Sequence, residues 1–232
     1  MTSPLVNLAL FHIGPAPITE PVLVTWAIMA ALVVGGLLVS RRLTLIPSTT
    51  QAAFELVVDA LDSLIRDTMR AEPTPYRALI GTLFVFILVA NWSSMIPGIT
   101  PPTAHIETDA ALALIVFVAV FWFGVRSGGV LGYLKTFASP SPIMIPLNFV
   151  ESLTRTFSLL VRLFGNVMSG VFVVGVVLSL AGLFAPIPLM ALELLTGAVQ
   201  AYIFAVLAMV FIAGALSEKS PASDASEEGT PS

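Results

Sequence analysis

Long apolar runs alternate with short polar stretches along this chain. A helix crosses a bilayer core with about 20 predominantly apolar residues. By that measure we expect five membrane spans, at residues 21–39, 78–96, 110–125, 147–183 and 187–216. The last two are longer than a perpendicular crossing requires, and a short proline-containing link around Pro186 favours a tight turn between them. The pattern predicts an all-α membrane protein that ends in a long, tilted helical hairpin.

Residues 48–70 show a different pattern, that of an amphipathic helix. Apolar residues recur at helical spacing on one face, and Ser48 with Gln51 fits a capping box at its start. The other face carries Glu55, Asp59, Asp62, Arg66, Asp67 and Arg70. So many charges exclude a bilayer crossing. We expect this helix to lie in the membrane interface; the alternative is a helix packed on a partner protein.

Composition supports lipid as the solvent. Of the 232 residues, 57% are hydrophobic and only 10% are charged, too few charges to cover the surface of a soluble domain. The chain has no cysteine, which excludes disulfides and thiolate metal sites, and both histidines lie outside the apolar runs. We expect no metal site, no cofactor and no nucleic-acid partner. We also expect no cleaved signal peptide.

The basic residues indicate the orientation of the chain. Eight of the ten Lys and Arg residues fall on one side if the N-terminus is outside and the C-terminus inside, in agreement with the positive-inside rule. We therefore expect an outer segment at 1–20, a membrane domain at 21–217 and a disordered cytoplasmic tail at 218–232. The other two basic residues, Arg155 and Arg162, lie within the fourth apolar helix.

Arg162 is the strongest candidate for a functional residue. An arginine at mid-membrane costs from about 3 to more than 10 kcal/mol, and its guanidinium cannot lose its proton, so it must face a carboxylate or water. The alternative is a structural ion pair with another helix. A wet face is favoured by a polar stripe at helical spacing, in which we expect the first two residues to pair. The stripe consists of Glu151, Arg155, Ser158, Arg162, Asn166 and Ser169.

The fifth helix carries a matching polar stripe of Glu193, Thr196 and Gln200. A hairpin that is symmetric about its turn places residues 172–179 opposite this stripe. Glu193 then lies on the outer side of Arg162, and Gln200 lies nearer its level.

Glu193 is the candidate proton carrier. Desolvation favours the neutral form of a buried carboxyl, which can then bind and release protons near neutral pH. The alternative is a carboxylate that forms a salt bridge with Arg162, which the expected separation disfavours. Asn91 and Ser94 lie one turn apart near the outer end of the second span. On their own, these two residues also fit polar groups that pack helices together.

Two motifs resemble a known family. The run from Arg162 to Asn166, with the sequence Arg-Leu-Phe-Gly-Asn, resembles the signature of subunit a of F-type ATP synthases. The run from Gln200 to Leu207 resembles the final-helix motif of that family. The resemblance extends in architecture over roughly residues 5 to 217.

The resemblance implies roles for individual residues. Arg162 matches the essential stator arginine, and Asn166 and Gln200 match polar residues near it. Asn91 matches a residue that lines the outer half-channel, and Glu193 falls at a titratable position.

The chain also departs from the family pattern. Val171 stands where the family usually has a second ionisable group, which leaves Glu193 as the only titratable group on the outer path. Asn148 stands where many members have an acid, and Ser94 where some have an aspartate. For the inner exit, the remaining polar groups are Asn148, Glu151 and Ser152.

The implied function is that of the ion-conducting stator subunit of a rotary ATP synthase, which is not an enzyme as an isolated chain. The implied partners are a ring of c subunits, b-type peripheral stalk subunits, the lipid bilayer and protons; Na⁺ is the alternative ion, selected by the ring. The expected location is a bacterial plasma membrane, with an energy-conserving organelle as the alternative.

Two other functions compete with this interpretation. A secondary transporter for a small anion could use Arg162 to bind a carboxylate, but it predicts internal repeats, and none is evident between the two halves. A purely structural scaffold does not account for a polar stripe on each helix of the terminal hairpin.

Overall fold

The computed structural model describes residues 9–13, 16–41, 49–96, 99–137, 144–182 and 184–217. The helices in these ranges are α1 (Glu20–Ser40), α2 (Thr49–Met69), α3 (Thr74–Trp92), α4 (Ile106–Phe137), α5 (Met144–Ala181) and α6 (Ile187–Ser217). Two 3-10 turns, η1 (Ser93–Met95) and η2 (Pro102–Ala104), lie between α3 and α4. Within these ranges, every α-helix except α2 contains a segment long and apolar enough to cross a membrane. The predicted all-α architecture with five candidate spans is therefore confirmed.

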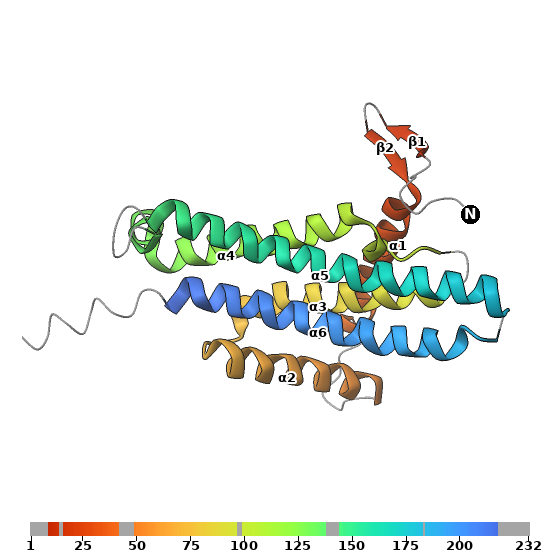
Figure 1. Ribbon diagram of the computed structural model, residues 1–232. Coiled ribbons are helices and arrows are strands. Elements are labelled where there is room, and N and C mark those ends of the chain that lie inside the picture. Colours follow the sequence, from red (N-terminus) through yellow and green to blue (C-terminus); the bar gives the residue numbers. More distant parts are fainter. Residues whose placement is uncertain are drawn as a thin grey trace, which may run out of the picture.

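A short antiparallel β-hairpin precedes α1 (Figure 1). Strand β1 (Ala9–Ile13) pairs with β2 (Ala16–Thr19), and His12 lies opposite Pro17. This hairpin is not evident in the sequence, because both strands are short and Pro17 interrupts the alternation in β2. It adds a small element to the helical architecture, at the N-terminal end of α1.

Helices α3, α4, α5 and α6 run side by side in two layers (Figure 1). Helices α4 and α5 form one layer, α3 and α6 form the other, and α6 contacts α2, α3, α4 and α5. The buried residues of α6 recur every three or four positions, as expected for a helix that faces the core along its length. They include Ala201, Phe204, Ala205, Ala208, Met209 and Ile212.

Much of the outer surface is apolar. At the tip of the α5–α6 hairpin, the side chains of Leu180 and Phe184 are 82% and 81% exposed, and Trp26 and Val33 of α1 are more than half exposed. Soluble monomers rarely expose apolar surface on this scale. The exposed apolar faces therefore fit a chain surrounded by lipid.

Helix α2 packs beside α3 and α6 (Figure 1). Asp62 of α2 forms an ion pair with Arg77 of α3, and Arg77 Nε donates to Asp62 Oδ1 at 2.6 Å. Ser48 of the predicted capping box lies outside the described residues, and Gln51 Nε2 donates to Glu55 Oε1 at 2.8 Å. The placement of α2 in the membrane interface stays a prediction.

The helix bounds differ from the predicted spans mainly at polar flanks. Helix α4 begins at Ile106, before the predicted span 110–125, and continues to Phe137 across a kink at Gly129, where φ is 71°. A polar residue ends an apolar run but does not have to end a helix, because the backbone hydrogen bonds of the helix do not depend on side-chain polarity. The helix therefore extends past the apolar run. The predicted tail at 218–232 lies outside the described residues.

Candidate functional site

Arg162 lies on an exposed flank of α5. Leu159, Leu163 and Val167 of the same helix are buried in the core, and Arg162 projects about 100° around the helix from Leu163. The guanidinium forms no hydrogen bond or ion pair with any residue that the structure describes. The alternative of a structural ion pair with another helix therefore finds no partner in the described part of the chain.

The rest of the α5 stripe surrounds this cation unevenly. Ser158 and Ser169 are exposed, Asn166 is half-buried, and Ser169 Oγ donates to the Asn166 carbonyl at 2.9 Å. The predicted pair of Glu151 and Arg155 is confirmed as an ion pair between exposed side chains. The stripe thus contains two cations: Arg155, which is paired within its own helix, and Arg162, two turns further on, which has no ion-pair partner among the described residues.

Two contacts set the register of the α5–α6 hairpin. A β-carbon on Gly170 would lie 2.8 Å from Glu193 Oε1, so the Glu193 side chain occupies the space that the glycine leaves open. Nearer the other end of the hairpin, the Arg155 guanidinium lies over the Phe211 ring, 5.6 Å from its centre. Glu193 therefore lies opposite Gly170, and not opposite the predicted range 172–179.

The prediction of a hairpin that is symmetric about Pro186 is wrong, for a local reason. Helix α5 ends at Ala181, and Gly182, with φ of 79°, starts the turn earlier than the prolines do. Gly170 follows Arg162 by only eight residues, so Glu193 lies about 12 Å along the helix axis from Arg162. Glu193 remains on the turn side of Arg162, and no salt bridge joins the two residues.

Asn91 joins α3 to α6 and to η2 from a buried position. Its Nδ2 donates to the Gly197 carbonyl at 2.9 Å, and its Oδ1 accepts from Thr103 Oγ1 at 2.7 Å. A β-carbon on Gly197 would lie 3.0 Å from Asn91 Cβ, so the two helices approach closely here. Because Gly197 follows Glu193 by one helical turn, Asn91 is placed beside the polar stripe of α6.

Two buried polar atoms of α6 lack a hydrogen-bond partner among the described residues. These are Glu193 Oε1 and Gln200 Nε2. Thr196, between them, donates its hydroxyl to the Glu193 carbonyl of its own helix at 3.1 Å. Buried polar atoms of this kind require water, an ion or another chain to offset their desolvation. Glu193 and Gln200 are therefore the candidates on α6 for contact with water, an ion or another chain.

Sequence reasoning missed a group of buried polar residues at and just before the start of α4. Thr103 and Asp109 have no exposed surface, and His105 is only 9% exposed. The predicted spans place these residues in the loop between 78–96 and 110–125. Their signal in the sequence was weak: Asp109 directly precedes an uninterrupted apolar run, which places it inside the helix rather than in the loop.

The residues predicted for the inner exit lie near the N-terminal end of α5, away from the α5–α6 turn. Ser152 Oγ donates to the Asn148 carbonyl at 3.0 Å, so this hydroxyl is engaged by its own helix. Asn148 precedes Arg162 by fourteen residues, which corresponds to about 21 Å along the axis.

The described residues contain no group of three or more His, Cys, Asp or Glu side chains that could hold a metal ion.

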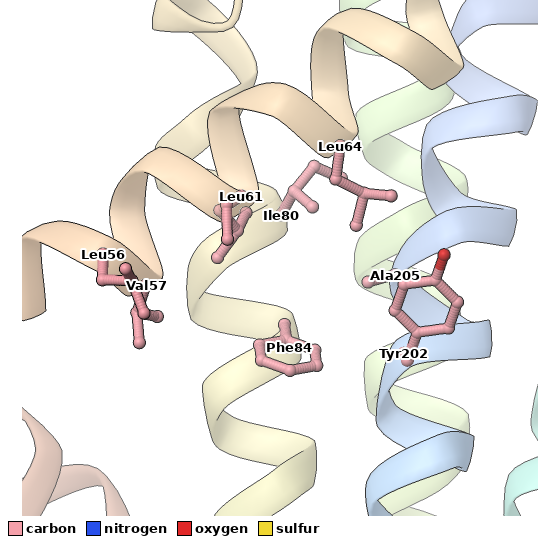
Figure 2. A pocket seen from close by; sticks show the side chains of 9 residues that line it. Leu56, Val57, Leu61, Leu64, Ile80, Phe84, Tyr202 and Ala205 are labelled. Carbon is pink, nitrogen blue, oxygen red and sulfur yellow. The ribbon is translucent and has the colours of Figure 1, made fainter. Parts of the chain in front are cut away.

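A cavity of 360 Å³ lies between α2, α3 and α6 (Figure 2). Its lining is apolar except for the Tyr202 hydroxyl, which excludes it as a route for ions. The lining residues are Leu56, Val57, Ala60, Leu61, Leu64, Ile80, Phe84, Tyr202 and Ala205.

Comparisons with known proteins agree on one family. A family model described as the ATP synthase A chain matches residues 22–213. The chain is 56% identical over 215 residues to "ATP synthase subunit a 2" of Bradyrhizobium sp., covering 93% of this chain and 96% of that protein. It is 43% identical over 222 residues to "ATP synthase subunit a 2" of Pelobacter propionicus, covering 96% and 97%.

Proposed function

The chain belongs to the ATP synthase A chain family, and we propose that it forms two offset half-channels for protons against a rotating ring of c subunits. Members of this family are non-catalytic membrane subunits of the ATP synthase complex, so the chain is not an enzyme on its own.

Arg162 is the single observation that carries the proposal. It is permanently charged, exposed on α5, and has no ion pair or hydrogen bond with the described residues. A cation in this setting needs an anion or water from outside the chain. A ring carboxyl satisfies this need: facing lipid it must be neutral, and beside Arg162 it can be ionised.

The outer half-channel follows the polar groups that meet at α6. Protons enter past Asn91, reach the Glu193 carboxyl and continue past Gln200 to a ring carboxyl near Arg162. The unpartnered Glu193 Oε1 and Gln200 Nε2 support this route, because both atoms are buried and both require a hydrogen-bond partner such as water or a hydrated ion. Thr196 lies between them on α6.

The inner half-channel runs along the N-terminal half of α5, on the other side of Arg162 from Glu193. Protons that have travelled on the ring exit near Asn148, Glu151 and Ser152. Arg162 separates the two paths and prevents a direct leak by electrostatic repulsion. Ser158, Asn166 and Ser169 keep the α5 surface around it polar. Each proton contributes about 2.3 kcal/mol per 100 mV of membrane potential, and the offset between the paths converts this into rotation.

The surroundings follow from the same proposal. The N-terminus lies outside and the C-terminus in the cytoplasm of a bacterial cell, in its plasma (inner) membrane. A peripheral stalk of b-type subunits holds the chain fixed while the ring turns. The wide apolar exposure of α1 supports lipid or stalk contacts on that side.

The test is Arg162→Ala in the assembled complex, with ATP-driven proton uptake measured in inside-out vesicles. Uptake is expected to be abolished, while co-purification with the c ring and peripheral stalk shows that assembly is intact. Arg126→Ala, which removes another exposed cation on α4, is the matched control and is expected to retain uptake. Normal coupling in the Arg162 variant would overturn the proposal.

A further inference from the structure

Asp109 is a buried acid to which the proposed route gives no role. Its side chain has no exposed surface, and neither carboxylate oxygen has a hydrogen-bond partner among the described residues. An ionised carboxyl without a partner is costly to bury, by several kcal/mol, so this group is either protonated or in contact with water. An acid in the first turn of a helix interacts favourably with the helix dipole whether or not it is buried. Glu107, in the same turn of α4, does so from an exposed position, so this interaction does not explain the burial of Asp109.

The surroundings of Asp109 connect it to the site already described. Its backbone N–H donates to the His105 carbonyl, with N and O 3.4 Å apart, and His105 directly follows η2. Thr103 of η2 donates to Asn91, which in turn donates to the Gly197 carbonyl of α6. The turn η2 contacts α1, α3, α4 and α5, so these polar groups lie inside the bundle rather than at its surface.

This arrangement is a series of buried polar groups from the start of α4 to the polar stripe of α6. Asn91 and Thr103 do not titrate at accessible pH, but their amide and hydroxyl groups can hold water. A carboxyl stands at each end of the series: Asp109 on α4, and Glu193 one turn before Gly197 on α6. Two proton-binding groups joined by polar groups that can hold water have the components of a proton relay.

We propose that Asp109 is a second proton-carrying residue of the outer half-channel, which takes protons from outside water and passes them to Glu193. The inference rests on the proposed function of the chain. A hydronium ion that arrives from outside transfers its proton to an ionised Asp109 carboxylate oxygen and becomes water. That proton then moves through water held at Thr103 and Asn91 to a Glu193 carboxylate oxygen, and Asp109 returns to its ionised form.

The first test removes the proton-binding group and keeps its size. Asp109→Asn in the whole complex is expected to lower passive proton flux through the membrane sector by at least tenfold, measured in sodium-free buffer after removal of the catalytic sector; a positioned proton-transfer group contributes about 10²-fold or more. Asp109→Glu, which retains a carboxyl, is expected to recover most of the flux. Unchanged flux in the Asn variant of an assembled complex would overturn the proposal.

The second test asks whether water reaches position 109. The chain contains no cysteine, so Asp109→Cys introduces a unique thiol. Ala113→Cys is the matched control, one turn further along α4 and equally buried at 1% exposure, but in the apolar core. A small maleimide added to membranes is expected to label Cys at 109 several-fold faster than Cys at 113. Equal, slow labelling at both positions would contradict a hydrated path.

The Arg162→Ala variant separates the two proposals. Loss of coupling in Arg162→Ala together with normal flux in Asp109→Asn removes only the role of Asp109. Normal coupling in Arg162→Ala removes the proposed function as a whole, and the role of Asp109 with it. A flux defect in Asp109→Asn that Asp109→Glu does not relieve, with slow labelling at position 109, identifies a packing role and overturns the relay.

Discussion

Gly170 of α5 and Glu193 of α6 share one small space: a β-carbon on the glycine would lie 2.8 Å from the Glu193 carboxylate oxygen. Real β-carbons essentially never come that close to another heavy atom. The position of the carboxyl therefore depends on the absence of a side chain on the facing helix. Glycine here serves a close approach between helices, as small residues do in membrane helix packing.

Gly170→Ala is expected to displace the Glu193 carboxyl and to lower proton flux by about tenfold or more, since misplacement of a reacting group by about 1 Å can cost as much as 10²-fold. The fold is expected to persist, because the displaced atoms are the far end of a flexible side chain. The measurement is passive proton flux in vesicles. Gly175→Ala is the control, because no atom lies within 4 Å of a β-carbon there. Equal flux in the two variants would refute the steric argument.

Glu193→Gln keeps the size of the side chain and removes its ability to bind a proton. Because the carboxyl is proposed as the proton carrier, flux is expected to fall by about 10²-fold. Thermal stability of the purified complex is expected to change little, since the amide fits the same space. Glu193→Asp is expected to retain part of the flux. A Gln variant with full flux would remove Glu193 from the path.

The Thr103–Asn91 hydrogen bond is suited to a double-mutant cycle. Thr103→Val and Asn91→Ala each leave a buried polar partner unsatisfied, which costs about 1–3 kcal/mol of stability. The double variant is expected to be more stable than the sum of the single losses predicts, by about 0.5–3 kcal/mol, because it leaves fewer orphaned groups. Thermal unfolding of the detergent-solubilised complex measures this. Strict additivity would show that the two side chains do not interact in the assembled protein.

The sequence predicts the helices of this chain well, because hydropathy is a local property. A run of apolar residues of sufficient length must be helical in lipid, whatever its neighbours are. The polar stripe of α5 was also predictable, since its members share one helix and spacing alone places them on one face. The pairing of Glu151 with Arg155 follows from the same spacing.

Relationships between helices were less predictable, because they depend on where turns begin. A left-handed Gly182 shifts the hairpin, and with it the residue that faces Glu193. Asp109 was missed for a related reason. Whether a polar residue at the edge of an apolar run is buried depends on what covers it, and here η2 and its neighbouring helices do so. No pattern within α4 alone contains that information.

The unneutralised Arg162 has a consequence for the free chain. A copy of this protein that is alone in a bilayer exposes a cation which its own described residues do not offset. Any neighbour that supplies a carboxylate at that point binds the folded form in preference to the unfolded one, and so raises its stability by mass action. If the ring of the proposed function supplies that carboxylate, we expect the assembled subunit to be more stable than the free chain.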